Sequence, residues 1–599
     1  MGLARRIARG ARALLATAAT LAAGAVVHAA PAGVPAKPAQ AATARPNVVV
    51  ILMDDVGFSD ISSYGGEIPT PNIDALAANG LRFTQFYNTA RCSPSRASLL
   101  TGTYPHQAGM GGLEEIVVPG SQGLHGRLLD RVVTMGEAMQ SAGYFTAMAG
   151  KWHLGMSRGV NPWERGFDRS LASPKGALYF PDQSEQGAKA LYLNGERLPV
   201  ASPRIGNGHW YSSDLFVDWG EKFIDEARAQ RKPFFLYLPF VGAHFPIMAP
   251  PEDVARFRGK YMQGWDTLRA ARLERQKRLG IVAPGEALPP RLPNTYDWDK
   301  LSPEDRDRFD AIMATYAASI ARIDKAVGDL VAGLKARGEL DNTLILFLSD
   351  NGGNGESGPD GRLIGGPPGS STSVVWAGMN WATLQNTPFQ YFKHHTEEGG
   401  IATPLIAHWP KGIDARLDGS LIRTPTHLID IMPTVLQASG GRYPRQFKGH
   451  DIVPMQGVSL MPSFRGKAIM RATPIFWEHE GNKAVRDGKW KLVGRFERPW
   501  QLYDMDESRA EMHDLAARHP DLVRRMAEQW NRWAASSYVD PWSEAYDIWI
   551  RENPPRQNWG ASETPQRPGA MNAMTDTLAR TLKARSDAKP LPDVPVVPD

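Results

Sequence analysis

The sequence of 599 residues is poor in cysteine and in excess charge. Its one cysteine, Cys92, has no partner in the chain for an intrachain disulfide, so chemistry or chance must explain its presence. Residues 1–30 hold four arginines and no acidic residue, which leaves 64 basic and 63 acidic residues, a net charge of +1, in the rest of the chain. This near balance gives no support to a nucleic-acid or membrane-surface partner.

A long uninterrupted apolar run is also missing at the N-terminus. The apolar stretch at 13–27 is short and is broken by Thr17, Thr20 and Gly24. It follows the four arginines and precedes small residues, an order typical of a secretory signal peptide over residues 1–30. We therefore predict an exported protein, periplasmic or secreted, without a stable membrane span. An uncleaved anchor is the alternative, and the export route stays open.

Several short apolar runs end in a polar or charged cluster. They cover residues 47–53, 144–149, 234–238 and 343–349. Runs of this kind are typical of strands buried on both faces, and helical patterns separate them, most clearly from Ser302 to Gly338. Alternating strands and helices predict an α/β fold, a large, doubly wound, mixed but mostly parallel sheet sandwiched by helices. Ligands of such a sheet bind at the carboxyl ends of the strands.

The pattern changes after about Pro474. Short strands joined by turns are expected at 474–478, 483–486, 490–493 and 500–503, with a helix at 520–533. These elements predict a smaller C-terminal α+β subdomain with a short antiparallel sheet. The predicted organisation is a signal peptide at 1–30, a flexible lead-in at 31–46, a catalytic α/β domain at 47–473, the subdomain at 474–540 and a Pro-rich tail at 541–599.

Cys92 begins the run Cys92-Ser93-Pro94-Ser95-Arg96, which predicts the start of a helix that Gly102 ends. A helix N-terminus offers free N–H groups and a positive dipole end, which suit a sulfate or phosphate ester. Arg96 would lie one turn along the helix and orient the side chain at position 92. A lone cysteine is usually a small core residue, but Pro94 and Arg96 at fixed offsets argue against that interpretation.

Two polar clusters follow the strands expected at 47–53 and 343–349. Asp54, Asp55, Asp350 and Asn351 supply the hard oxygen ligands that Ca²⁺ or Mg²⁺ prefers, without the thiolates or histidines that favour zinc. A single Asp at a strand end is more often a helix cap or turn residue. Two such clusters, far apart in the sequence, favour a metal site.

Basic side chains occur near the same predicted strand ends. They are Lys151, His153, His244 and Lys393. Lys151 and His153 stand two residues apart and would point to the same side of an extended chain. Together the four residues would form a ring of positive groups, whereas His394 and His395, directly after Lys393, are left outside the site.

The run from Cys92 to Gly102 resembles the Cys-x-Pro-x-Arg signature of the type I sulfatases, in which the cysteine is oxidised to formylglycine. The resemblance covers roughly residues 46–534 and is strongest to bacterial arylsulfatases. It includes Asp54-Asp55, Gly150-Lys151-Trp152-His153, His244, Asp350-Asn351-Gly352, Lys393 and Thr396 to Gly400. It implies an alkaline-phosphatase-like fold and a sulfuric ester hydrolase that cleaves sulfate monoesters to an alcohol or phenol plus sulfate.

The resemblance also implies how position 92 would act. A formylglycine-generating maturation enzyme would modify Cys92, and one hydroxyl of the formylglycine hydrate would attack sulfur to give a sulfoenzyme intermediate. The second hydroxyl would then expel sulfate. The implied ligands of Ca²⁺, or of Mg²⁺, are Asp54, Asp55, the modified Cys92, Asp350 and Asn351.

The remaining roles follow from the same resemblance. Arg96 would stabilise the formylglycine, while Lys151 and Lys393 would neutralise the sulfate oxygens. His153 would deprotonate the second hydroxyl. His244 would contact the substrate and protonate the leaving group, with Lys393 as a possible partner in that step.

Other functions remain open on the sequence alone. A phosphodiesterase or phosphonate monoester hydrolase shares the fold, but we expect a histidine in its metal set, where this chain has Asn351 after Asp350. A protein left unmodified at Cys92 would instead be a calcium-dependent sulfate-ester binding protein. Five aromatic residues before Lys393 weakly favour an aryl substrate over an alkyl sulfate or a sulfated sugar. They are Trp376, Trp381, Phe389, Tyr391 and Phe392.

Overall fold

The structure is a computed structural model, and it describes residues 45–183, 190–293 and 295–552. The predicted signal peptide, nearly all of the lead-in and the tail from residue 553 onward lie outside the described residues. Within the described ranges, no helix is both long and apolar enough to cross a membrane.

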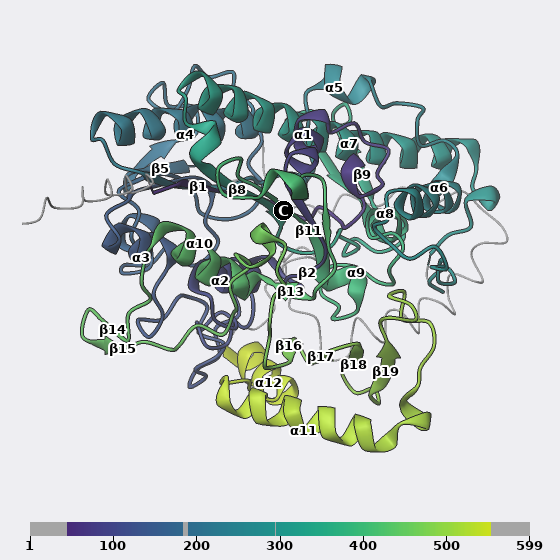
Figure 1. Cartoon of the computed structure of the whole chain (residues 1–599). Helices are drawn as coiled ribbons and strands as arrows, with labels where there is room; N and C mark the ends of the chain where they lie inside the picture. Colours follow the sequence, from purple (N-terminus) through teal and green to yellow (C-terminus); the bar gives the residue numbers. More distant parts are fainter. Residues whose placement is uncertain (1–44, 184–189, 294, 553–599) are drawn as a thin grey trace, which may run out of the picture. The chain divides into compact units, whose positions relative to one another are not determined.

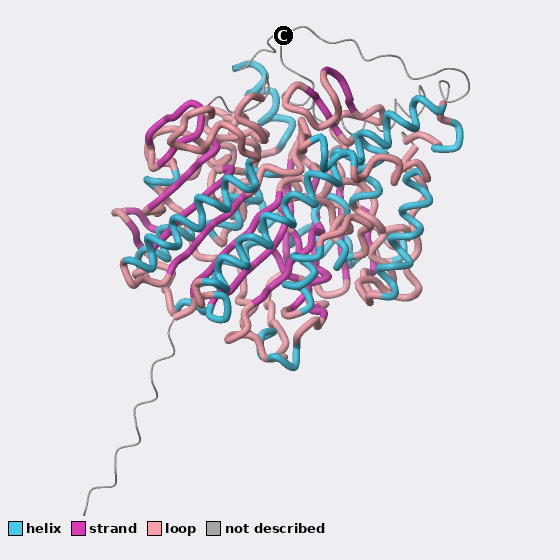
Figure 2. The backbone as a smooth tube through the Cα atoms, turned by 90° about the horizontal axis from the view of Figure 1, so that it is seen from above, coloured by secondary structure: helices cyan, strands magenta, loops and turns pink. Residues whose placement is uncertain are grey.

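One large mixed sheet carries the fold, with eleven strands among the described residues (Figures 1 and 2). In spatial order its strands are β12 (Leu421–Ile422), β2 (Leu81–Tyr87), β11 (Ala402–His408), β8 (Thr343–Ser349), β1 (Asn47–Met53), β7 (Phe234–Pro239), β3 (Phe145–Lys151), β4 (Arg169–Ser173), β5 (Ala190–Leu193) and β6 (Glu196–Pro199), and β13 (Thr426–His427) pairs with β2. The central strands β8, β1, β7, β3 and β4 run parallel. Strand β11 is antiparallel to its neighbours, as are β5 and β6. The predicted mixed, mostly parallel sheet is confirmed.

Helices cover both faces of this sheet, which explains why the strand runs are apolar throughout. Val49, Ile51 and Met53 of β1 share a core with α1 (Pro71–Ala78), α4 (Ser212–Ala229) and α7 (Pro303–Ala336). Val48 and Val50 share the opposite core with α2 (Cys92–Thr101), α3 (Met135–Ser141) and α10 (Ile431–Ser439). Figure 1 shows the first group of helices above the strands and the second group below them.

The long helix α7 follows its sequence signals. The Ser302 side chain accepts a hydrogen bond from the Asp305 N–H at 3.1 Å and caps the helix, which starts at Pro303. Gly338, with φ +69°, lies just beyond its end. The smaller elements of this part are α5 (Pro251–Ala255), α6 (Gly264–Arg278), β9 (Arg362–Gly365), β10 (Ser373–Trp376), α8 (Gly378–Gln385), α9 (Glu398–Ile401), β14 (Gln446–Phe447) and β15 (His450–Asp451).

A second, four-stranded antiparallel sheet follows in the C-terminal part. Its strands are β16 (Ile475–His479), β17 (Asn482–Asp487), β18 (Trp490–Gly494) and β19 (Gln501–Asp504), and α11 (Pro520–Ser536) packs on β17 and β18. Phe476 and Trp533 of this part form a core with Tyr104 and Ile429 of the α/β part. The predicted short antiparallel sheet is confirmed, and the boundary near residue 474 stays a prediction.

The first residues of the segment that we assigned to a tail form a helix, α12 (Trp542–Glu552). Trp542, Tyr546 and Trp549 recur at helical spacing and pack against a cluster that contains Ile116 and Val118. The Trp549 indole N–H also donates to the Glu115 carbonyl at 3.1 Å. Because these aromatic side chains are buried, residues 542–552 belong to the folded part of the chain and not to a tail.

Candidate active site

The predicted site residues gather at the carboxyl edge of the parallel strands. Asp54 and Asp55 follow β1, and Asp350 and Asn351 follow β8, its direct neighbour in the sheet. Lys151 ends β3, and His244 lies in the loop after β7. Because β1, β8, β3 and β7 are parallel, their ends bring together side chains that are nearly 300 residues apart, such as the 295 residues between Asp55 and Asp350.

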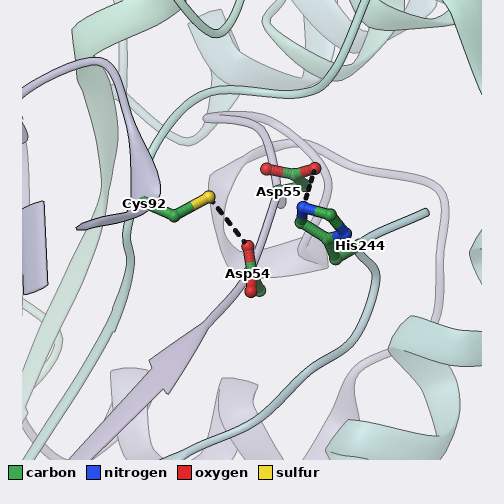
Figure 3. A group of neighbouring side chains, drawn as sticks. All are labelled: Asp54, Asp55, Cys92 and His244. Atoms are coloured by element: carbon green, nitrogen blue, oxygen red, sulfur yellow. Dashed lines mark hydrogen bonds and ion pairs between the residues drawn. The ribbon is translucent and has the colours of Figure 1, made fainter. Parts of the chain in front are cut away.

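Cys92 is the first residue of α2 and is only 1% exposed. Its sulfur lies 3.4 Å from Asp54 Oδ1 and 3.3 Å from Asn351 Oδ1, either of which can accept its one S–H, and Figure 3 shows the sulfur turned toward Asp54. Burial, followed by the charge of Asp54, raises the pKa of the Cys92 thiol well above its ordinary value. An unmodified Cys92 is therefore protonated and weakly nucleophilic.

Arg96 joins the two acidic clusters from within α2. Its Nε and one terminal nitrogen donate to Asp350 Oδ2 at 3.2 and 2.9 Å, and the same terminal nitrogen donates to Asp54 Oδ2 at 3.1 Å. The other terminal nitrogen donates to the Lys151 carbonyl at 2.9 Å. Arg96 thus holds the carboxylates that flank position 92.

The two lysines pair with the two adjacent aspartates. Lys151 Nζ lies 2.6 Å from Asp54 Oδ2, and Lys393 Nζ lies 2.7 Å from Asp55 Oδ1. Burial alone would raise the pKa of Asp54, but Lys151, followed by His244 and Arg96, holds it well below its usual range. Lys393 likewise outweighs the effect of burial on Asp55 and lowers its pKa. Both aspartates are therefore ionised at neutral pH.

Asp350 behaves differently, because burial and the negative charge of Asp54 raise its pKa to about 7. Ligand atoms of Asp54, Asp55, Cys92 and His244 all lie within 4.8 Å of one another. Asp350 and Asn351 lie beside this group, so three carboxylates and one amide, each at most 1% exposed, supply the oxygen donors that suit a hard divalent cation. The residues present fit such an ion.

The two histidines of the predicted ring are both neutral. Burial, followed by Lys151 and Arg96, lowers the pKa of His153 well below its ordinary value. Burial, followed by Lys151, lowers the pKa of His244 to about 4. The His244 Nδ1 lies 2.6 Å from the Phe245 carbonyl oxygen, which leaves Nε2 facing Asp55 Oδ2 at 3.8 Å (Figure 3).

One geometric premise of the sequence analysis is wrong. His153 has φ +57°, so the chain after β3 turns into a left-handed conformation and does not stay extended. The buried His153 Nδ1 has no hydrogen-bond partner among the described residues. Ligand atoms of His153, Glu114 and Glu115 lie within 4.8 Å of one another, which places an acidic pair beside this histidine.

Three polar residues of the site escaped the sequence analysis. Asn354 Nδ2 donates to Asp55 Oδ2 at 2.8 Å and to Glu356 Oε2 at 3.1 Å. The Glu356 side chain is 8% exposed, forms an ion pair with Arg91 and lies 3.8 Å from Lys393 Nζ. Their one sequence signal is position, since Arg91 precedes Cys92 and the other two follow Asn351 closely.

Only one of the five predicted pocket aromatics is stacked toward His244. Phe245 stacks on the His244 ring at 4.2 Å between centroids, and Trp376 packs on Phe245 at 4.0 Å. The other four make their ring contacts elsewhere. Trp381 packs with Trp265 in the core, Phe389 with Phe58, Tyr391 with His395, and Phe392 with His395.

Comparison with known proteins agrees with this arrangement. Residues 46–441 match the family model described as Sulfatase, and residues 389–535 match one described as N-sulphoglucosamine sulphohydrolase, C-terminal. The chain belongs to the sulfatase family. The resemblance inferred from the Cys92 motif is thereby confirmed.

Two individual relatives are similar to this chain over most of its length. It is 36% identical over 553 residues to an uncharacterized sulfatase of Schizosaccharomyces pombe, which covers 86% of this chain and 97% of the relative. It is also 36% identical over 439 residues to an arylsulfatase of Klebsiella aerogenes, across 69% of this chain and 91% of the relative. The protein is thus a sulfatase with an arylsulfatase among its relatives.

Solved structures agree on the fold. The crystal structure of Ps i-CgsB in complex with k-i-k-neocarrahexaose has a TM-score of 0.62 at 24% identity and covers 90% of this chain and 99% of its own. The phosphonate monoester hydrolase of Agrobacterium radiobacter has a TM-score of 0.51 at 20% identity, across 82% of this chain and 96% of its own. These likenesses concern the alkaline-phosphatase-like fold and not the substrate.

Proposed function

We propose that this sulfatase is an arylsulfatase, which hydrolyses aryl sulfate monoesters to a phenol and inorganic sulfate. The observation that carries the proposal is the setting of Cys92, which begins a helix between Asp54 and Asn351 with Arg96 one turn behind. The identity of 36% to an arylsulfatase supports the aryl substrate class. So does the stack of Phe245 and Trp376 beside His244, a flat apolar surface for a ring.

A divalent cation would be held by Asp54, Asp55, Asp350 and Asn351 together with the side chain at position 92. Ca²⁺ suits this carboxylate-rich set of oxygens, and Mg²⁺ is the alternative. When bound, the cation supplies positive charge that offsets the negative charge of the sulfate group. The support for it is the set of three fully buried carboxylates, two of which stay ionised.

Position 92 would be formylglycine, produced from Cys92 by a maturation enzyme. As its hydrate, formylglycine supplies one hydroxyl that attacks sulfur and a second that releases sulfate. The Cys92-Ser93-Pro94-Ser95-Arg96 motif and the match to the sulfatase family support this modification. Arg96 would keep Asp54 and Asp350 oriented toward position 92 through its three short hydrogen bonds to them.

The remaining basic residues would bind the anion and move protons. Lys151 and Lys393, both buried and both beside an aspartate, would contact the sulfate oxygens of the substrate. His153, neutral because of burial, would accept a proton from the second hydroxyl at position 92. His244 would protonate the leaving phenol from Nε2 in its imidazolium form, because Nδ1 keeps its own proton to donate to the Phe245 carbonyl and the neutral ring has none on Nε2.

We also propose that the protein is exported to the periplasm or secreted. Support comes from residues 1–30, where arginines, an apolar stretch and small residues occur in the order of a signal peptide.

Two measurements on one preparation from the natural host test the enzymatic proposal. Mass spectrometry of the peptide that contains Cys92 should show the thiol sulfur replaced by an aldehyde oxygen. The same protein should turn over an excess of 4-nitrophenyl sulfate faster than a phenyl phosphonate monoester. An intact thiol with binding but no turnover would indicate the binding protein, and a preference for the phosphonate would indicate the phosphonate monoester hydrolase.

A further inference from the structure

A second cluster of metal-binding residue types lies apart from the residues assigned to the reaction. It consists of His394, on the loop after Lys393, and His479 and Glu480, where β16 ends. The three side chains are 6%, 1% and 6% exposed. They come from segments about 85 residues apart and meet where the C-terminal sheet faces the α/β part.

The spacing of these side chains is wrong for hydrogen bonds. His394 Nδ1 lies 3.7 Å from Glu480 Oε2, and His479 Nε2 lies 3.6 Å from Glu480 Oε1. An N–H···O hydrogen bond is about 2.7–3.2 Å long. Two ligands of a tetrahedral ion, each about 2.0–2.2 Å from it, are about 3.4 Å apart. Both distances are therefore close to those between ligands that share one ion.

Polar atoms of this cluster without hydrogen bonds also favour a bound ion. Both ring nitrogens of His479 are buried, and neither makes a hydrogen bond of good geometry within the described structure, although the Gly111 backbone lies close enough to raise the pKa of the ring. Leaving one such group unpaired costs about 1–3 kcal/mol. The His394 and His479 rings stand nearly perpendicular, at 78° with 5.0 Å between centroids, and ligand atoms of both lie within 4.8 Å of a Glu480 oxygen. An ion between them would satisfy His479 Nε2.

Burial sets the protonation of the three side chains. Burial lowers the pKa of His394 and of His479 well below the ordinary value, so both imidazoles are in the neutral form that binds metals. Burial raises the pKa of Glu480 to about 7, and the neighbouring carboxylates Glu356 and Glu478 add to this effect against Arg91. Arg91 and Lys393 also act on both histidines, and Glu356 and Glu478 pair with Arg91 and His106, so Glu480 is the carboxylate that would balance the charge of an ion.

We propose that His394, His479 and Glu480 bind a divalent transition-metal ion of the Zn²⁺ class, with a water molecule at the fourth position. Two imidazoles and one carboxylate suit Zn²⁺, whereas the oxygen-rich set at Asp54 and Asp55 suits Ca²⁺ or Mg²⁺. The chain would thus have two metal sites that bind different ions, because their donor atoms differ. The ion would tie the turn after β16 to the loop that carries Lys393, which pairs with Asp55.

The test measures metal content and not turnover. The full chain is loaded with Zn²⁺ in a large excess of Ca²⁺, which fills the oxygen-rich site, then desalted and analysed by inductively coupled plasma mass spectrometry. The wild-type protein should retain stoichiometric Zn²⁺. His479→Ala and the nearly isosteric Glu480→Gln should each weaken Zn²⁺ binding by more than about 100-fold, beyond the loss expected from removing an outer-shell partner.

Two controls keep the result interpretable. His209→Ala removes an exposed histidine and should retain Zn²⁺ as the wild type does. Asp350→Ala should also keep its Zn²⁺, which separates this site from the active site.

Circular dichroism identifies the variants that stay folded, and Zn²⁺ should raise the melting temperature of the wild type but not of Glu480→Gln. Loss of all Zn²⁺ from the desalted wild type, or equal retention by folded Glu480→Gln, would overturn the proposal.

Discussion

Two buried clusters of charged side chains in this molecule contain the same residue types but differ in function. In the active site, Asp54, Asp55 and Asp350 meet Arg96, Lys151 and Lys393. The second cluster, which we call the support network, consists of Glu398, Glu511, Lys491 and Arg509. Lys491 Nζ lies 3.0 Å from Glu398 and 2.7 Å from Glu511, and Arg509 lies 2.6 Å from Glu398.

The clusters differ in what lies among the ion pairs. The active site includes a thiol and two neutral imidazoles, groups that can gain or lose a proton or a covalent bond during a reaction. The support network joins α9, β18 and the chain around residue 510, and it reaches β2 through the Tyr87 hydroxyl, which donates to Glu398, and the Thr84 carbonyl, which accepts from Arg509. Buried ion pairs alone therefore do not identify a reactive site, whereas ion pairs around a thiol and neutral imidazoles indicate one. Substitutions should separate the two clusters by their effect on turnover and on stability.

The largest effect is expected for Cys92→Ala. The variant loses the atom from which the nucleophile would form, so kcat should fall by at least ~10⁴-fold, as in enzymes stripped of a nucleophile. Ser93→Ala, the next residue of α2, is the matched control and should remain active. Turnover is measured on 4-nitrophenyl sulfate and folding by circular dichroism. Retained activity in Cys92→Ala would contradict the assignment.

Asp350→Ala should remove the metal and the activity together. The substitution deletes one oxygen ligand and leaves Arg96 with Asp54 as its remaining carboxylate partner. Asp341→Ala, an exposed aspartate shortly before β8, serves as the control and should keep both properties. Calcium and magnesium contents are measured after desalting. An unchanged metal content in Asp350→Ala would rule out Asp350 as a ligand.

Glu398→Gln tests the support network. It leaves Lys491 and Arg509 buried with one carboxylate fewer, which should lower the free energy of unfolding by about 3–5 kcal/mol. Urea denaturation measures this change, and turnover per folded molecule at low temperature should stay near that of the wild type. Glu544→Gln, on the exposed face of α12, should change stability by less than about 0.5 kcal/mol. A large loss of turnover in folded Glu398→Gln would contradict the assignment of the support network to stability and not to the reaction.

His244→Ala should show a loss that depends on the leaving group. Removing a general acid costs about 10²-fold or more when the departing oxygen needs a proton. Alkyl sulfates and phenyl sulfates without activating groups should therefore suffer more than 4-nitrophenyl sulfate, which leaves as a stable anion. A series of substituted phenyl sulfates measures the dependence, and an equal loss across the series would exclude the general-acid role.

Acid should weaken the support network over a defined range of pH. Burial alone would raise the pKa of Glu398, but Lys491 and Arg509 lower it to about 2, against 4.5 for the ordinary carboxyl. A lowered native pKa gives stability that is present above pH 4.5 and is lost as the pH falls toward 2, about 3 kcal/mol for this shift. The difference in unfolding free energy between the wild type and Glu398→Gln should shrink across that range. A constant difference would contradict the charged form of Glu398.

Local patterns were sufficient for much of the fold and for the centre of the site. Residues 47–53 and 343–349 are strands to the residue, because an apolar run buried on both faces ends where the first carboxylate appears. Helix α2 begins at Cys92 and stops at Gly102, which has φ +68°, as the motif predicted. These features depend on neighbours in the sequence, so the sequence reveals them.

Features that depend on tertiary contacts were missed. Glu356 and Asn354 lie in a loop without periodicity, and only folding brings them to Asp55 and Lys393. The left-handed conformation at His153 could not be predicted, because the residue is neither glycine nor asparagine, the types that commonly adopt it. His479 and Glu480 reach His394 because the C-terminal sheet packs beside the α/β part, a long-range contact that no local pattern encodes.

The burial of Cys92 also sets an order of events in the life of the chain. A thiol that is 1% exposed, at the start of a helix packed under the strand ends, is out of reach of any catalyst the size of a protein. An enzyme that oxidises this residue must therefore act before the segment from 92 to 101 docks into the core. If an enzyme modifies position 92, as we propose, it must act before folding is complete, and a chain that folds first would keep its thiol.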